Sequence, residues 1–175
     1  MNSNSDQDKI LEQCEFQDNL SILRQITFFS GLPIELLKVF AYLCTREELT
    51  SGHYLFSQDD DDGCGYFIIS GQTELVRKEN DAEQVVKTFE EGVFIGVLSL
   101  LGTMPRLFSL KAKDPVTCLV ITREKFTKAV ERFPEIMPKL IQMIVNRIAL
   151  WDKQAIHARS GQWKEYNENI GISVI

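Results

Sequence analysis

One glycine and one arginine in the middle of the chain have types and a spacing suited to holding an anion. Gly96 follows a short apolar run, and Arg106 lies ten residues later. A glycine permits close approach of the backbone, and the guanidinium of an arginine offers a fork of donors to a phosphate or a carboxylate. Leu98 and Ser99 lie between them in a short helical pattern whose backbone N–H groups would point one way. Residues 94–112 are therefore a candidate ligand-binding loop.

The same loop also carries apolar residues where an anion would need polar ones. Val97 follows the glycine, and Leu107 and Phe108 follow the arginine. If these three side chains face the ligand, they form an apolar plug. Ser109 is the nearest hydroxyl and could contact a phosphate. Arg106 has two open interpretations, because it either holds an anion or pairs with an acidic residue of the chain.

No other group of residues in the sequence predicts catalysis or metal binding. The acidic run at residues 59–62 lacks the outer ligands of a calcium loop, because Gln58 and Ile69 occupy those positions, and we expect a solvated hairpin loop. His53 and His157 each stand alone, whereas a jelly-roll metal enzyme needs a close histidine pair. The sequence shows no nucleophile–base pair and no paired carboxylates. We therefore predict that the protein is not an enzyme.

The composition is that of a folded acidic chain. Of the 175 residues 44% are hydrophobic, which supports a core, and 11 are phenylalanines, which suit a barrel or sandwich filled by large rings. The net charge is −6 and the basic residues are scattered, so we expect no direct nucleic-acid partner. No apolar run is long enough for a membrane span. The four cysteines form no close pairs, which predicts reduced thiols in the cytoplasm.

The hydrophobic pattern predicts helices on both sides of a strand-rich middle. Apolar spacing predicts four helices, at about residues 10–25, 34–44, 123–133 and 135–158. Residues 1–9 are polar and are expected to be disordered. Short strands recur through the middle at intervals typical of an antiparallel sandwich or barrel. The last helix carries an apolar stripe, which suits packing on its own domain or pairing with a second copy.

Three stretches resemble the cyclic-nucleotide-binding domain family, which occurs in catabolite-activator-type regulators, kinase regulatory subunits and gated channels. Residues 23–32 resemble the opening segment of that family. Residues 55–71, which run from L-F-S-Q to Y-F-I-I-S-G, resemble its strand-turn-strand, and residues 94–106 resemble its phosphate-binding cassette, with the proline before the arginine. The resemblance covers about residues 20–158. It implies an eight-stranded jelly-roll, a double-stranded β-helix, with N-terminal helices and two C-terminal helices.

The resemblance also implies a ligand site. In that family the cassette backbone and its arginine hold the cyclic phosphate, and a glutamate after the glycine binds the ribose 2′-hydroxyl. The implied phosphate-cassette residues here are Gly96, Leu98, Ser99, Arg106 and Ser109. Val97 stands at the glutamate position, and Leu107 and Phe108 stand where relatives carry small residues. An unpaired buried hydroxyl costs roughly 1–3 kcal/mol, so we predict that ordinary binding of cyclic AMP or cyclic GMP is lost. The alternative is a changed ligand that is smaller or more apolar.

The predicted organisation is a flexible or helical extension (residues 1–19), a binding-like domain with its C-terminal helix (20–160) and a tail (161–175). The predicted function is a non-catalytic sensor or regulatory module that signals to a separate effector by shifting helices 123–133 and 135–158 against the barrel. One alternative is a structural dimerisation domain with a self-filled pocket, joined through the last helix. The other is a catabolite-activator-type transcription regulator without its own DNA-binding domain.

Overall fold

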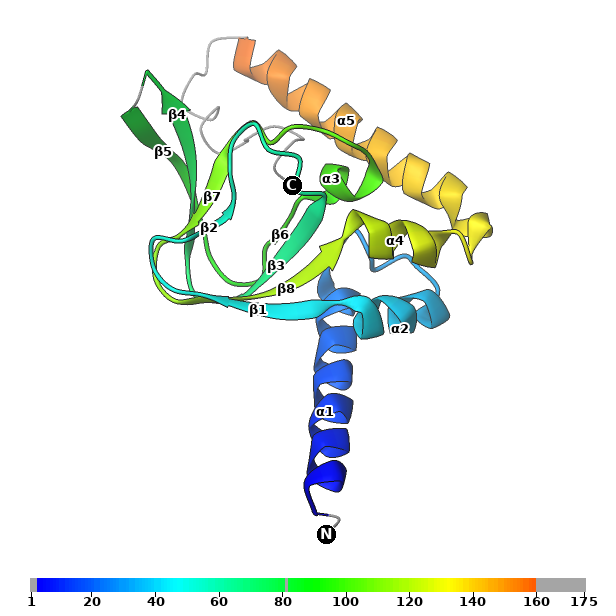
Figure 1. Ribbon diagram of the computed structural model, residues 1–175. Coiled ribbons are helices and arrows are strands. Elements are labelled where there is room, and N and C mark those ends of the chain that lie inside the picture. Colours follow the sequence, from blue (N-terminus) through cyan, green and yellow to red (C-terminus); the bar gives the residue numbers. More distant parts are fainter. Residues whose placement is uncertain (1–2, 81, 160–175) are drawn as a thin grey trace.

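The computed structural model describes residues 3–80 and 82–159, which form two β-sheets with helices gathered at one end (Figure 1). Two helices come first, α1 (Ser3–Gln25) and α2 (Ile34–Leu43). The strands are β1 (Thr45–Leu49), β2 (Tyr54–Phe56), β3 (Cys64–Ser70), β4 (Thr73–Glu79), β5 (Ala82–Phe89), β6 (Phe94–Ile95), β7 (Ser109–Ala112) and β8 (Val116–Thr122). The short helix α3 (Val97–Leu101) lies between β6 and β7, and the chain continues through α4 (Arg123–Val130), a 3-10 turn (Pro134–Ile136) and α5 (Met137–Arg159).

Each sheet contains four strands, and every paired strand is antiparallel. One sheet has the order β1-β8-β3-β6 and the other β2-β7-β4-β5. Strands from opposite ends of the β-region pair with each other, as β1 does with β8, so the topology is a jelly-roll rather than a simple meander. The predicted fold class is therefore confirmed.

Alternation along β3 and β8 sends side chains into two separate cores. Tyr66 and Ile68 pack between the sheets, whereas Phe67 packs on the helices. In β8, Cys118 faces the sheet core and Leu119 faces the helical core. Successive residues of a strand point to opposite faces, so these two strands join both cores.

Phenylalanine rings hold the helices on the sandwich. The ring centroids of Phe29 and Phe40 lie 5.4 Å apart, as do those of Phe29 and Phe94, and Phe40 stacks on Phe126 at 5.2 Å. Contacts of this kind are favourable beyond the apolar area that they bury. Because Phe94 belongs to β6 and Phe126 to α4, the cluster fixes the cassette relative to the helices that follow it.

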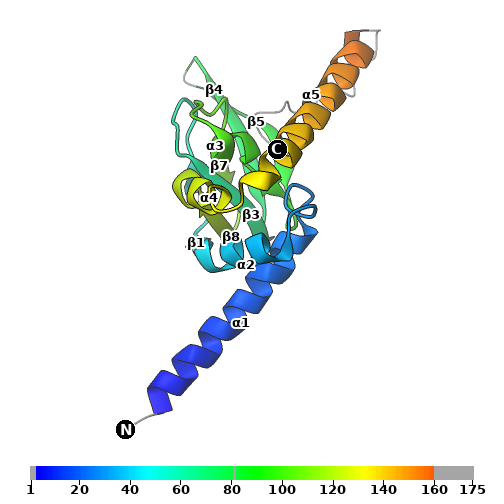
Figure 2. The same cartoon turned by 90° about the vertical axis from the view of Figure 1, so that its right-hand side faces the viewer.

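The N-terminal helix is longer than the sequence predicts. It begins at Ser3, so the disorder expected for residues 1–9 is wrong from that residue onward. Acidic residues near a helix N-terminus complement the helix dipole, which offsets the lack of apolar residues there. The helix also runs through the predicted boundary at residue 19 and projects away from the body (Figure 2).

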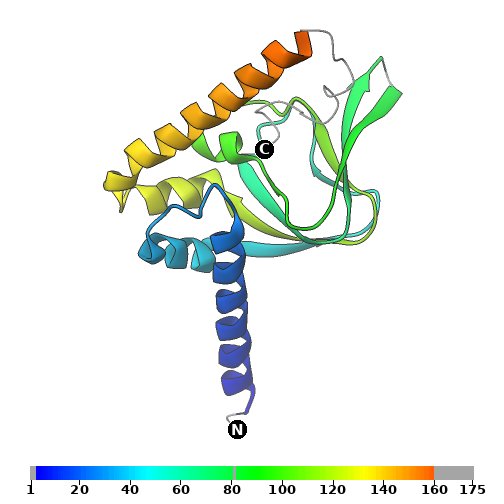
Figure 3. The same cartoon turned by 180° about the vertical axis from the view of Figure 1, so that it is seen from behind.

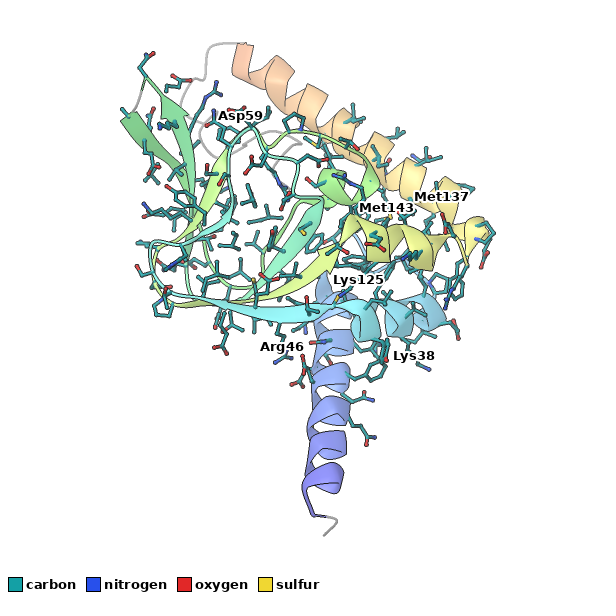
Figure 4. All side chains as sticks on the ribbon, in the orientation of Figure 1. Lys38, Arg46, Asp59, Lys125, Met137 and Met143 are labelled. Carbon is teal, nitrogen blue, oxygen red and sulfur yellow. The ribbon has the colours of Figure 1, made fainter. Side chains whose placement is uncertain are left out.

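Polar contacts tie the C-terminal half of α1 to the rest of the domain. The Asn19 side chain is 2% exposed, donates to the carbonyl of Ala41 and accepts from Nε of Arg46. Arg46 lies beside α1 in Figure 4 and also forms an ion pair with Asp18. The last residues of α1 are therefore part of the domain.

Two other boundaries differ from the sequence-based expectation, and a third is not tested. β6 was expected to be part of the ligand loop, but it pairs with β3. The helix expected over residues 123–133 ends at Val130, where the chain turns before Pro134. The predicted tail, residues 161–175, lies outside the described residues.

Replacing Phe40 by alanine should lower the free energy of unfolding by about 3–5 kcal/mol, because the ring is fully buried and contacts two other rings. Chemical denaturation followed by circular dichroism measures the change. Tyr42→Ala is the matched control on the same helix. Its side chain is 82% exposed, so its effect should stay within about 0.5 kcal/mol. Equal effects of the two substitutions would contradict the packing described here.

Candidate functional site

Gly96 occupies a position that only glycine can fill. Its φ is +100°, in the left-handed region, at the junction of β6 and α3. A Cβ at this position would lie 2.5 Å from the carbonyl oxygen of Cys64 and 3.1 Å from both Nη1 and Nη2 of Arg106. Both the backbone conformation and the space therefore require glycine, and the guanidinium lies directly against it.

Arg106 is held inside the protein by an acidic residue. Its side chain is 2% exposed, and Nε donates to Oδ1 of Asp62 at 2.7 Å while Nη2 donates to Oδ2 at 3.0 Å. Nη2 also donates to the carbonyl oxygen of Cys64 at 2.6 Å. Nη1 is buried and has no hydrogen-bond partner among the described residues. Of the two interpretations left open by the sequence, the structure shows the pairing with an acidic residue.

Asp62 is itself fixed from a second side. The hydroxyl of Tyr66 lies 2.9 Å from Oδ2 of Asp62 and 3.0 Å from the carbonyl oxygen of Leu55. Burial, and then the negative charge of Asp62, raise the pKa of the Tyr66 phenol, so it stays protonated at neutral pH. The guanidinium carbon of Arg106 lies 4.0 Å from the ring centroid of Phe56, a cation–π arrangement. Arg106 is buried and Asp62 is partly buried, so the two form a supported, largely buried pair rather than a surface contact.

The loop between β2 and β3 pairs with the cassette through its backbone as well. The N–H of Asp59 donates to the carbonyl of Arg106, and the N–H of Arg106 donates to the carbonyl of Asp60, each at 2.8 Å. Asp59, labelled in Figure 4, lies in the loop at the end of the body opposite α1. The backbone therefore places Asp62 beside the arginine.

Asp61, the preceding residue, makes a second ion pair, with Arg123 at the start of α4. Both guanidinium nitrogens Nη1 and Nη2 of Arg123 donate to Asp61, and Nε donates to the carbonyl of Ser99 at 2.6 Å. The hydrogen bond from Arg123 lowers the pKa of Asp61, whose carboxylate is therefore ionised at neutral pH. Arg123 thus connects the acidic loop, α3 and α4.

The three residues expected to plug the pocket lie in different places. Val97 is partly buried and packs on the helical core. Leu107 is 53% exposed, so it does not fill a buried pocket. Phe108 packs on the sheet core, and its ring centroid lies 5.8 Å from the guanidinium carbon of Arg77. They form no common plug.

The remaining residues of the predicted cassette are Leu98, Ser99 and Ser109, and they are at least partly buried in the fold. Leu98 is half-buried on α3, and Ser99 is fully buried with a hydroxyl that has no partner among the described residues. The hydroxyl of Ser109 accepts the N–H of Gln58 at 2.8 Å, so it already has a partner in the neighbouring loop.

The sequence did not single out Asp61, Asp62 or Arg123. The acidic run was expected to be solvated, which is wrong for Asp62, whose side chain is 18% exposed and ion-paired. The only feature of the sequence that pointed to these residues was the run of aspartates itself. Nothing in that run indicates that Arg106 is the partner of one of them.

An open groove of about 620 Å³ lies between the acidic loop and α4. Its lysine and its arginine are already paired, Lys128 with Glu124 and Arg123 with Asp61. The groove therefore carries no unpaired basic group for a ligand.

Among the described residues no group of histidine, cysteine or carboxylate side chains is arranged to hold a metal ion.

Residues 46–133, just over half of the chain, match the family profile described as the cyclic nucleotide-binding domain. The chain belongs to this family. Its jelly-roll and its Gly96–Arg106 cassette are the structural counterparts of that match.

The relatives include protein kinases, kinase regulatory subunits, an acetyltransferase and a potassium channel. Human cGMP-dependent protein kinase 2 is 23% identical over 147 residues, which cover 82% of this chain and 19% of the kinase. The chain thus spans about a fifth of the length of that relative. The N-terminal domain of a transcriptional regulator from Streptomyces coelicolor A3(2) superposes with a TM-score of 0.68 at 22% identity, covering 77% of this chain and 94% of that one.

A third relative is the regulatory subunit of a cAMP-independent protein kinase A from Trypanosoma cruzi, solved bound to guanosine. It superposes with a TM-score of 0.60 at 20% identity, covering 71% of this chain and 44% of that one. At such identities the two solved structures show the fold alone.

None of the described helices combines the length and the apolar character that crossing a bilayer requires.

All four cysteines are free thiols, and burial raises the pKa of Cys44 and of Cys118 to about 12. The cytoplasmic location inferred from the sequence stays a prediction.

Replacing Gly96 by alanine should lower the free energy of unfolding by at least about 2 kcal/mol, because the new Cβ needs an unfavourable φ and overlaps the Cys64 carbonyl. Denaturant unfolding measures this. Gly102→Ala is the control at the other end of α3, where no atom lies within 4 Å of the added Cβ. A Gly96→Ala protein as stable as Gly102→Ala would contradict the left-handed backbone and the close approach of the Cys64 carbonyl at this glycine.

Proposed function

We propose that this chain is a non-catalytic regulatory module of the cyclic nucleotide-binding family that does not use cyclic AMP or cyclic GMP as its ordinary ligand. The observation that carries the proposal is the two-point ion pair of Arg106 with Asp62. A phosphate bound to Arg106 would have to lie beside the Asp62 carboxylate, which already neutralises the guanidinium. Two negative groups in contact with the same arginine repel each other strongly where bulk water does not screen them.

The residue after the cassette glycine supports the same proposal. Val97 has no hydrogen-bonding side chain, and it packs on the helical core. A ribose hydroxyl would find no carboxylate at this position. The T. cruzi relative, which is described as cAMP-independent and was solved with a nucleoside, supports the idea that members of this fold can do without a cyclic phosphate.

The contacts also suggest how the module transmits a change. Arg123 joins the carbonyl of Ser99 on α3 to the first turn of α4, and α4 leads through a single 3-10 turn into α5. We propose that a movement of α3 is passed through Arg123 to these two helices and from them to a separate effector protein. Direct nucleic-acid binding is not part of the proposal, because the chain is acidic.

A second candidate function is dimerisation through α5, favoured by one observation. Several apolar side chains on the described part of this helix are exposed, namely Met137, Ile141, Val145, Ile148 and Leu150. Met137, Ile141 and Ile148, together with the half-buried Ile144, have the alternating four- and three-residue spacing of a two-helix seam. Seen from behind, α5 runs from α4 past α3 and is open along its outer side (Figure 3). We propose that a second copy of the chain covers this stripe.

Thermal-shift and calorimetric titrations with cyclic AMP, cyclic GMP, adenosine and guanosine test the main proposal. We expect no shift with either cyclic nucleotide at millimolar concentration, whereas a true ligand at 100 times its Kd would stabilise the fold by about 2.7 kcal/mol. The Arg106→Ala variant is the control for site occupancy. Stabilisation by a cyclic nucleotide that Arg106→Ala removes would overturn the proposal.

Sedimentation of the wild type beside an Ile141→Glu variant tests the second candidate. A charge in the middle of the seam should shift the protein from dimer to monomer, because it would be buried without a partner. Gln142→Glu makes a similar change on the neighbouring polar face and should leave the mass unchanged. A monomeric wild type, or equal masses for both variants and the wild type, argues against a dimer through α5.

A further inference from the structure

Two of the three guanidinium nitrogens of Arg106 have hydrogen-bond partners, and the third, Nη1, is buried without one among the described residues. Nε and Nη2 form the side-on edge of the guanidinium, and this edge is filled by the two oxygens of Asp62. The second N–H of Nη2 points to the carbonyl of Cys64. Only Nη1 is left, so no edge of the fork offers the two parallel donors with which an arginine binds a phosphate bidentately.

The carboxylate on that edge is placed as an external anion would be. Its two oxygens each accept a hydrogen bond from the guanidinium, as two oxygens of a phosphate would. The hydroxyl of Tyr66 also donates to Oδ2 of Asp62. Arg106 is 2% exposed and the Asp62 side chain is 18% exposed, so the pair is poorly screened by solvent. The two charges cancel, and the site offers little attraction to a second anion.

We propose that Asp62 is an internal anion that replaces a ligand phosphate on Arg106 and is the residue that sets the charge class of ligand accepted by the cassette. The proposal rests on the proposed function and names the residue that enforces it. Two anions about 4 Å apart near a protein surface repel by an amount equivalent to roughly three decades in affinity. Removing the charge of Asp62 while keeping its shape should therefore turn the site into one that binds phosphate.

The test uses the Asp62→Asn variant with inorganic phosphate as the probe and chloride at the same ionic strength as the reference. Without phosphate the variant should melt below the wild type, because Arg106 is left buried with an incomplete partner. Phosphate at about 100 times its Kd should raise the melting temperature of the variant by roughly 5–10 °C, and that of the wild type should not change.

Two further variants make the result specific. Asp60→Asn removes the same charge from the same loop, but its exposed side chain does not contact the guanidinium, so it should respond to phosphate as the wild type does. The double variant Asp62→Asn/Arg106→Gln should lose the phosphate effect. A gain that persists in the double variant would mean that phosphate binds elsewhere, and it would overturn the proposal.

A folding defect does not remove the test. If Asp62→Asn does not fold in chloride, the yield of folded protein on refolding in phosphate becomes the readout, with Asp62→Ser as a second variant that leaves more room for the anion. Recovery in phosphate but not in chloride supports the proposal. If phosphate neither stabilises nor refolds either variant, Asp62 is not what excludes an anion. That result would leave the cyclic-nucleotide titrations of the wild type unaffected, so the two proposals fail separately.

Discussion

The site depends on a buried ion pair between Arg106 and Asp62, residues 44 positions apart in sequence. A buried guanidinium is costly unless its charge and its donors are satisfied, and removing one partner of such a pair typically costs about 3–5 kcal/mol. The surroundings pair the charge and two of the three nitrogens from several elements at once, and only Nη1 has no hydrogen-bond partner among the described residues. The loop before β3 supplies the carboxylate, Gly96 leaves room for the guanidinium, and the Phe56 ring covers its face. The pair therefore acts as a structural connection and as the feature that defines the site's charge.

The pair is one half of a connected set of contacts. The next aspartate in the same loop, Asp61, binds Arg123, which also holds the carbonyl of Ser99 on α3. The loop therefore contacts both the cassette and the first turn of α4. The phenylalanine cluster then joins α4 to α2 and β6. Because these connections meet at α3 and α4, a change at the cassette has a direct physical route to the C-terminal helices.

Much of the fold could be predicted from the sequence, because alternation in the strands and apolar spacing in the helices are local signals. Short strands at regular intervals predicted an antiparallel sandwich or barrel, and the resemblance to the cyclic-nucleotide-binding family implied the jelly-roll. The site was harder to predict. Their positions in the cassette suggested that the side chains of Val97, Leu107 and Phe108 would share a pocket. The direction in which each side chain points, however, depends on the path of the loop as it leaves its strand. The partner of Arg106 was beyond sequence reasoning, since it depends on a loop-to-loop backbone pairing that no local pattern encodes.

The cassette arginine is ion-paired at two points with the protein's own carboxylate. A crystal structure of the wild type grown with saturating cyclic AMP tests it most directly. We predict that Nε and Nη2 of Arg106 are bonded to both oxygens of Asp62, with no nucleotide on the cassette between Gly96 and Arg106. A cyclic phosphate bound to Arg106, with Asp62 displaced or sharing the guanidinium, would contradict it.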